Sequence, residues 1–215
     1  MRPLYDAVLF DLDGTLTDSE PGIVKSVQYA LEKLRLPVPD RRNLRFFVGP
    51  PLMDSFLKAG VARPDLQSAV DFFQERYARI GWTENSVYPG IRELLDGLRD
   101  AGLRLSVATM KPERFAVPVL KRFDLYGYFE RVCAKRSEGL NPSKADMIRE
   151  ALPDSDSRAC MVGDRCYDMD GAGAAGIDGI GALWGCGSRE ELLAAGAKSL
   201  AETPDALQRL LIGPK

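Results

Sequence analysis

Short apolar stretches alternate with helical patterns along most of this chain, and this alternation constrains the fold more than any other feature. An apolar stretch of about 4–8 residues without polar alternation is typical of a strand that is buried on both faces of a parallel sheet. We interpret the following ranges as such strands: residues 7–10, 103–109, 131–134, 159–162 and 179–183. Strands that alternate with helices predict an α/β fold with a Rossmann-like, doubly wound parallel sheet.

Helical periodicity fills most of the gaps between these strands. Ile91, Leu94, Leu95 and Leu98 recur at the spacing of one helix face, and Gly102 follows where such a helix should end. Similar patterns predict helices at residues 112–123, 144–151 and 189–195.

The segment between residues 19 and 83 has a different organisation. It contains helical patterns at residues 23–34, 52–60 and 66–80, and we find no strand pattern between them. Because the segment follows the first strand directly, we expect a small helical cap domain (19–83) inserted into an α/β core domain (1–18 and 84–215).

Composition excludes several classes of function. The formal net charge is −2, with basic and acidic residues interspersed, so a nucleic acid polymer is not an expected partner. No apolar run approaches the roughly 20 residues of a membrane span, so we expect no membrane partner and a cytoplasmic location. We expect a monomer or weak homodimer. The chain has no histidine, which excludes Ser-His-Asp and Cys-His nucleophiles and imidazole metal sites.

Two carboxylates follow the first predicted strand. Asp11 and Asp13 come after residues 7–10 and precede Gly14. They stand at the carboxyl end of the strand, where open α/β sheets bind ligands, and residues two apart on an extended chain point to the same side. Such a pair is tolerated when a metal lies between the carboxylates or when one of them stays protonated.

Other polar side chains converge on the same edge of the predicted sheet. Thr109 ends the second strand, and Asp164 ends the fourth, with Asp168 four residues later. Lys144 begins the helix between the third and fourth strands, although Lys135 is a possible competitor for its role. Residues 171–176 match G-x-G-x-x-G but do not follow a strand directly, so we interpret them as a small-residue helix face packed on the sheet.

In its ordered motifs the chain resembles the haloacid dehalogenase superfamily of phosphohydrolases. The motifs are Asp11-Leu12-Asp13-Gly14-Thr15, then Thr109, then Lys144, and finally Gly163-Asp164 with Asp168. Asp13 and Thr15 resemble the phosphatase branch. The helical insert corresponds to the first type of cap in this superfamily, and the segment 137–143 before Lys144 departs from the usual third motif.

The resemblance implies a role for each matched residue. Asp11 is the expected nucleophile, Asp13 the acid and base, Thr109 a hydrogen-bond donor to the phosphoryl group, and Lys144 a fixed positive charge. Mg²⁺ is the expected cofactor, held by Asp11, the backbone carbonyl of Asp13 and Asp164, with support from Asp168.

The substrate is expected to be a small-molecule phosphate ester. Resemblance to a branch close to phosphoglycolate phosphatase, which is often labelled 5′-nucleotidase-like, favours a nucleoside 5′-monophosphate, with phosphoglycolate as the alternative. Arg45 and Gly49 in the expected cap are candidate substrate contacts, while the ordinary interpretation of Arg45 is a solvated helix face. One alternative is a sugar phosphomutase, which would keep the same core residues. An alternative that is not an enzyme is a non-catalytic binding module.

Overall fold

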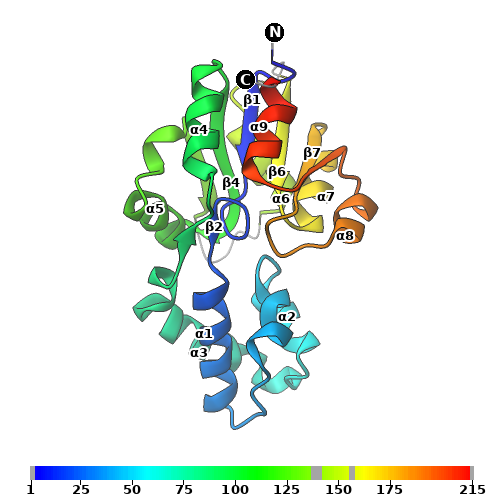
Figure 1. The fold of residues 1–215 in the computed structure, drawn as a ribbon. Coiled ribbons are helices and arrows are strands. Elements are labelled where there is room, and N and C mark those ends of the chain that lie inside the picture. The colour runs from blue at the N-terminus through cyan, green and yellow to red at the C-terminus, as the bar shows by residue number, and fades with distance from the viewer. Residues whose placement is uncertain (1–2, 137–141, 155–157, 214–215) are drawn as a thin grey trace. The chain divides into compact units, whose positions relative to one another are not determined.

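The structure is a computed structural model that describes residues 3–136, 142–154 and 158–213. The described chain divides into two compact units, which we treat separately (Figure 1). The first unit joins Met1–Thr17 to Val87–Lys215, and the second is Asp18–Ser86. The chain passes between the units through two short strands that pair with each other, β2 (Thr17–Asp18) and β3 (Ser86–Val87).

The first unit is built on a parallel sheet. Within the described residues this sheet has six strands in the order β5-β4-β1-β6-β7-β8. Every neighbouring pair in it is parallel, which confirms the predicted α/β fold class. The strands are β1 (Ala7–Phe10), β4 (Arg104–Pro112), β5 (Arg131–Lys135), β6 (Ala159–Gly163), β7 (Asp178–Ala182) and β8 (Ser199–Ala201).

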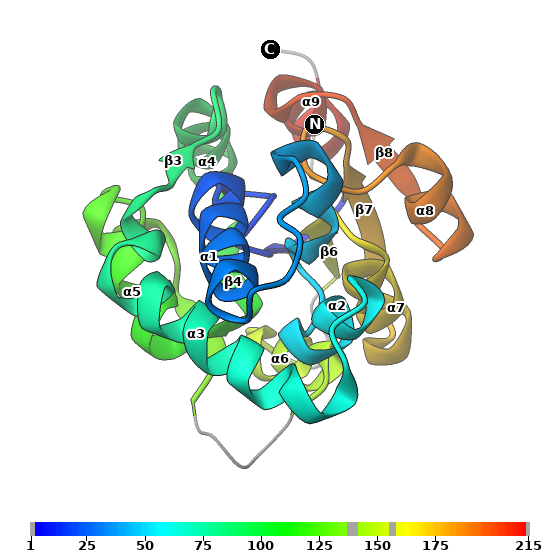
Figure 2. The same cartoon turned by 90° about the horizontal axis from the view of Figure 1, so that it is seen from below.

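Helices cover both faces of the sheet (Figures 1 and 2). On one face, Met147 and Ile148 of α6 pack into a core with Leu9 and Met161, while α4 and α9 pack together on the other face. None of the helices in the described ranges combines the length and apolar character that a membrane span requires. The helices of this unit are α4 (Ile91–Asp100), α5 (Glu113–Arg122), α6 (Lys144–Ala151), α7 (Cys166–Ala175), α8 (Arg189–Ala194) and α9 (Pro204–Ile212), with a 3₁₀ turn η4 (Tyr126–Tyr128).

The strand order brings the ends of β4, β1 and β6 together. Phe10 lies opposite Val107 of β4 and Val162 of β6, so the carboxyl ends of the three strands form one edge. The chain that continues beyond each strand therefore enters the same region.

One strand runs further than the sequence predicted. We expected the second strand to end at Thr109 and a helix to begin at Pro112, but β4 continues to Pro112. Its register against β5 shifts between Ala108 and Pro112. Pro112 pairs with Lys135 beyond this irregularity, so Lys111 lies inside the strand.

The second unit is helical. Helices α1 (Glu20–Lys33) and α3 (Leu66–Arg79) pack side by side (Figure 2). The ring of Phe47 meets that of Phe56 edge to face at 5.0 Å, and Phe73 stacks on Tyr77 at 5.3 Å between centroids. The remaining elements are η1 (Arg41–Phe47), α2 (Leu52–Lys58), η2 (Arg63–Asp65) and η3 (Gly81–Thr83).

Candidate functional site

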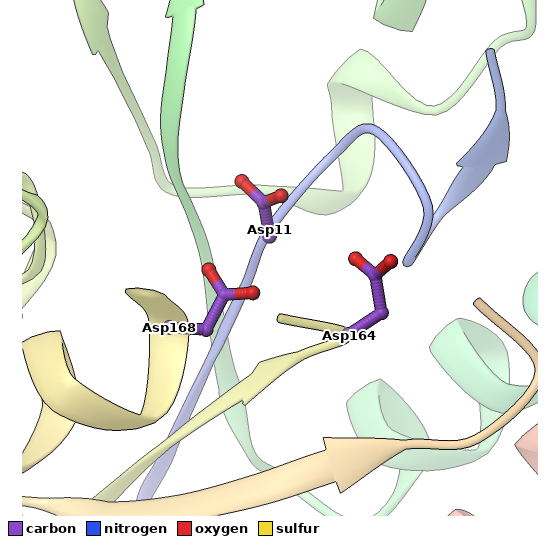
Figure 3. Close-up of side chains that lie close together, drawn as sticks. All are labelled: Asp11, Asp164 and Asp168. Carbon is purple, nitrogen blue, oxygen red and sulfur yellow. The ribbon is translucent and has the colours of Figure 1, made fainter. Parts of the chain in front are cut away.

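Buried carboxylates converge at the carboxyl edge of the sheet (Figure 3). Asp11 follows β1 and is fixed by its backbone N–H, which donates to the carbonyl oxygen of Val162 at 3.0 Å. Asp164 follows β6, and Asp168 lies in the first turn of α7. In the described chain, one carboxylate oxygen from each of the three aspartates lies within 4.8 Å of the others.

Lys144 joins two of these carboxylates. Its Nζ lies 2.8 Å from Oδ1 of Asp11 and 2.6 Å from Oδ1 of Asp168. Lys144 is the first residue of α6, and a capping box formed by Ser143 and Asp146 fixes where that helix begins. The local sequence therefore positions the ammonium group through a well-defined helix start.

The glycine-rich part of α7 makes room for this lysine. A Cβ atom on Gly171 would lie 2.7 Å from Cγ of Lys144, so a larger residue would displace the lysine side chain. Ala172 on the same helix is buried in the core against the sheet. Gly171 thus contributes packing space, and residues 171–176 lie in the body and C-cap of α7 rather than in a strand-to-helix phosphate loop.

Asp168 is also held by its own helix. Its Oδ2 accepts a hydrogen bond from the backbone N–H of Arg165 at 3.0 Å. A Cβ atom on Gly163 would lie 2.2 Å from Cγ of Asp168, so the carboxylate packs directly on the end of β6. The other oxygen faces Lys144 as described above.

Asp164 is fully buried and accepts a hydrogen bond on each oxygen. The hydroxyl of Thr15 donates to Oδ1 at 3.1 Å, and the backbone N–H of Cys186 donates to Oδ2 at 2.8 Å. Thr15 entered the sequence prediction only as part of the first motif, and Cys186 had no assigned role.

A second lysine, which the sequence prediction missed, lies at Asp13. Lys111 donates to both carboxylate oxygens of Asp13 at 2.8 Å, and its backbone N–H donates to the hydroxyl of the buried Thr109 at 3.2 Å. The available signal was its position two residues after Thr109, because alternate residues of a strand point to the same side.

Burial shifts the proton affinities of these groups. Burial raises the pKa of Asp164 to about 8, with a further increase from the charge of Asp168. Burial likewise raises the pKa of Asp11 to about 6, although Lys144 opposes the shift. For Lys144, burial alone lowers the pKa, but the charges of Asp11 and Asp168 outweigh it and raise the pKa overall. The lysine therefore stays charged.

The balance of charge suits a divalent cation. Four aspartates against two lysines leave an excess of two negative charges when all are ionised (−4 + 2 = −2). Buried carboxylates without compensating charge are costly, and oxygen ligands are those that Mg²⁺ prefers. The residues present therefore fit such an ion. The charged groups are Asp11, Asp13, Asp164, Asp168, Lys111 and Lys144.

The remaining candidate residues belong to other elements of the chain. Arg45 belongs to the second unit, where its Nε lies 2.8 Å from Oε2 of Glu20, and Arg41 holds the other oxygen of the same carboxylate at 2.7 Å. Gly49 is also in that unit, with a φ of +101° that favours glycine. Lys135 ends β5. Residues 137–141 of the third-motif segment lie outside the described residues.

Comparison with protein families and curated proteins places the chain among phosphatases. Residues 8–182 match the family model described as haloacid dehalogenase-like hydrolase. A 5′-nucleotidase of Pseudomonas aeruginosa is 40% identical over 195 residues, which cover 88% of each chain. A phosphoglycolate phosphatase of Cupriavidus necator is 34% identical over 213 residues, which cover 95% of this chain and 92% of the relative.

Further similarities extend to a solved structure and to a protein with a different name. The crystal structure of a predicted phosphatase from Clostridium acetobutylicum superposes with a TM-score of 0.88 at 41% identity, covering 96% of this chain and 97% of the other. The tyrosine-protein kinase PtkA of Mycobacterium tuberculosis is 40% identical over 183 residues, which cover 84% of this chain. The matched part is 62% of the length of PtkA, so this chain spans less than two thirds of that relative.

Proposed function

Because the chain belongs to the haloacid dehalogenase-like hydrolase family and is a phosphatase of that superfamily, we propose that it cleaves phosphomonoesters through an aspartyl-phosphate on Asp11. The observation that carries the proposal is the placement of Asp11. Its carboxylate stands at the carboxyl end of β1, is oriented by Lys144 at 2.8 Å, and is near Asp164 and Asp168.

The first chemical step forms the covalent intermediate. An oxygen of Asp11 attacks phosphorus, the new O–P bond forms, and the bond from phosphorus to the leaving oxygen breaks. Asp13 gives that oxygen a proton, so the product leaves as an alcohol. Thr109 and Lys144 bind the phosphoryl oxygens and offset their charge.

The second step returns the enzyme to its starting state. Water attacks the phosphorus of the aspartyl-phosphate while Asp13 takes a proton from that water. The bond between phosphorus and Asp11 breaks, and inorganic phosphate leaves. One side chain thus serves as acid in the first step and base in the second.

The proposed metal is Mg²⁺, since superfamily phosphatases use a metal ion and the acidic group described above offers hard oxygen ligands. The carboxylates of Asp11 and Asp164 and the backbone carbonyl of Asp13 would hold it, with Asp168 in support. A bound divalent ion supplies positive charge that lets an anionic nucleophile meet a phosphate dianion.

The proposed substrate is a nucleoside 5′-monophosphate. The support is similarity to the Pseudomonas aeruginosa 5′-nucleotidase. Phosphoglycolate is the second candidate, because the Cupriavidus necator relative is named phosphoglycolate phosphatase at lower identity.

We also propose that the helical unit acts as a substrate-selecting cap in which Arg45 and Gly49 contact the leaving group. Arg41 provides a matched control for Arg45, since both pair with Glu20. Arg45→Ala should raise the KM for the preferred substrate, whereas Arg41→Ala should change it little. An equal change in KM in the two variants would indicate that the effect comes from loss of the ion pairs with Glu20. It would contradict a contact between Arg45 and the substrate.

The test of the function is phosphate release by the full chain with Mg²⁺. The panel contains nucleoside 5′-monophosphates, phosphoglycolate, sugar phosphates and p-nitrophenyl phosphate, and an ATP arm tests phosphoryl transfer to protein. Asp11→Asn should abolish release, while Asp170→Asn, at an exposed aspartate of α7, should not. Release by Asp11→Asn near the wild-type rate, or full activity after chelation of divalent ions, would contradict the mechanism.

A further inference from the structure

The segment between β7 and α8 closes tightly over Asp164. A Cβ atom on Gly185 would lie 2.3 Å from Cβ of Asp164, and one on Gly187 would lie 2.0 Å from its carbonyl oxygen. Contacts this short are not tolerated between real atoms, so both positions need glycine. The backbone of residues 184–187, which we call the clasp, therefore lies directly against this aspartate.

A second segment approaches Asp164 from the end of β1. Gly14 has a φ of +86°, and a Cβ atom there would lie 2.3 Å from Oδ2 of Asp164. The neighbouring Thr15 donates its hydroxyl to Oδ1, while Cys186 of the clasp donates its backbone N–H to Oδ2. The carboxylate is thus fixed between two segments that are far apart in sequence.

Trp184 connects the two segments. Its indole Nε1 donates to the carbonyl oxygen of Thr15 at 2.9 Å. Beyond the clasp, Glu191 of α8 accepts hydrogen bonds from the backbone N–H of Cys166 at 3.0 Å and from Nε of Arg165 at 2.9 Å. Arg165 follows Asp164 directly, so the clasp and α8 together immobilise this part of the chain.

From these contacts we infer that Trp184 is a positioning residue that closes the clasp and so orients the Asp164 carboxylate for a divalent cation. The inference rests on the proposed function, which assigns Asp164 to the metal. An ionised carboxylate offers about four lone-pair sites, so one hydrogen bond on each oxygen fixes its direction and still leaves it able to bind a cation. Supporting partners of this kind typically contribute about 10–100-fold to metal affinity.

The test is direct titration of metal-free full-length protein with Mg²⁺ by calorimetry. Trp184→Phe keeps an aromatic ring, although a smaller one, and removes the N–H donor, so the Thr15 carbonyl loses its partner and the clasp loosens. We expect a rise of about 10-fold in the Kd for Mg²⁺. The matched control is Trp82→Phe, which changes the other of the two tryptophans of the chain, in the helical unit, and should leave the Kd unchanged.

The control variant gives an independent readout. In Trp82→Phe the remaining indole is Trp184, and we expect its fluorescence to change as Mg²⁺ saturates the site. Urea unfolding in EDTA separates positioning from general stability, because a merely structural role would lower the free energy of unfolding without changing the Kd. If Trp184→Phe does not fold, Gly185→Ala tests the contact between the clasp and Asp164, since its Cβ would displace that aspartate, and an unchanged Kd in Gly185→Ala would overturn the inference.

The outcomes separate this inference from the proposed function. A weakened Kd in Trp184→Phe beside an unchanged Trp82→Phe supports it. A wild-type Kd in a folded Trp184→Phe overturns it, as does absence of Mg²⁺ binding by the wild type. Failure of the proposed function would appear elsewhere, as phosphate release by Asp11→Asn.

Discussion

Lys111 donates hydrogen bonds to both carboxylate oxygens of Asp13, and each oxygen lies 2.8 Å from the ammonium nitrogen. Only 3% of the lysine side chain and 14% of the aspartate side chain are exposed. A nearly buried ammonium on both oxygens fixes the plane of the carboxylate more firmly than a single solvent-exposed contact would. If Asp13 is the acid and base, Lys111 sets the direction in which it presents its oxygens.

Lys111→Met should therefore lower kcat by on the order of 10–100-fold, a part of the 10²–10⁴ that acid–base catalysis contributes. The KM should change less, because the lysine is proposed to act through Asp13. The measurement is steady-state phosphate release from the preferred substrate. Lys198→Met is the matched control, since Lys198 also pairs with an aspartate, Asp178 at 2.6 Å, but at an exposed position. Equal kcat values in the two variants would show that Lys111 does not orient Asp13 for catalysis.

Asp13→Asn should slow the reaction in a way that depends on the leaving group. A nucleoside alkoxide needs a proton to depart, whereas p-nitrophenolate leaves readily without one. We therefore expect a loss of roughly 10²-fold or more with the nucleotide and a smaller loss in the first step with p-nitrophenyl phosphate. Rapid-quench measurement of the first turnover isolates that step. The same loss on both substrates would refute the acid role of Asp13.

The sequence was sufficient to predict the α/β class and the strands that carry the site. Residues 7–10 and 159–162 are uninterrupted apolar runs, and such runs occur where a strand is buried on both faces. The helix α9 was not predicted, although Leu207 and Leu211 recur at helical spacing and Thr203 caps its first turn. The short edge strand β8 was not predicted either, because only Ala201 is buried in it and its three residues carry no periodicity. Edge strands this short need tertiary contacts to be recognised.

Convergence of Asp11 and Asp164 could be anticipated because the carboxyl ends of parallel strands lie at one edge of the sheet. The partners that orient these side chains could not be derived in the same way. The contact between Trp184 and Thr15 depends on how a loop folds back across the sheet, and spacing in sequence carries no information about it. Lys111 was accessible from strand alternation, but the predicted end of β4 fell three residues too early.

Lys144→Met should destabilise the protein as well as remove activity. The ammonium compensates the buried charges of Asp11 and Asp168, and breaking a buried pair by removing one partner costs about 3–5 kcal/mol. Urea unfolding should show a lower free energy of unfolding, while Lys198→Met, which breaks an exposed pair, should cost about 1 kcal/mol or less. The double variant Lys144→Met/Asp168→Asn should regain part of the lost free energy of unfolding, because it also removes the Asp168 charge that Lys144 no longer compensates. Additive losses in the double variant would contradict direct coupling.

The raised pKa values of Asp164, about 8, and Asp11, about 6, predict how the metal-free protein responds to pH. The ordinary value for these carboxyl groups is 3.8, so between about pH 4 and 8 the folded chain binds more protons than the unfolded chain. Stability falls with rising pH wherever the folded state holds the extra protons. These two groups therefore make the free energy of unfolding decrease as the pH rises from about 4 to about 8. Unfolding in EDTA at several pH values measures this dependence, and Asp164→Asn should make the free energy of unfolding depend less on pH.

Mg²⁺ binding should show the opposite dependence, because the ion requires ionised carboxylates and must displace the protons that burial retains on Asp164 and Asp11. The apparent Kd should therefore fall as the pH rises from 6 to 8, by up to about tenfold per pH unit for each proton displaced. Calorimetric titrations in two buffers of different ionisation enthalpy count the protons released. A Kd that is constant over this range, with no proton release, would mean that both carboxylates are already ionised without the metal. In that case Lys144 and the hydrogen bonds from Thr15 and Cys186 would outweigh burial in setting the charge of the site.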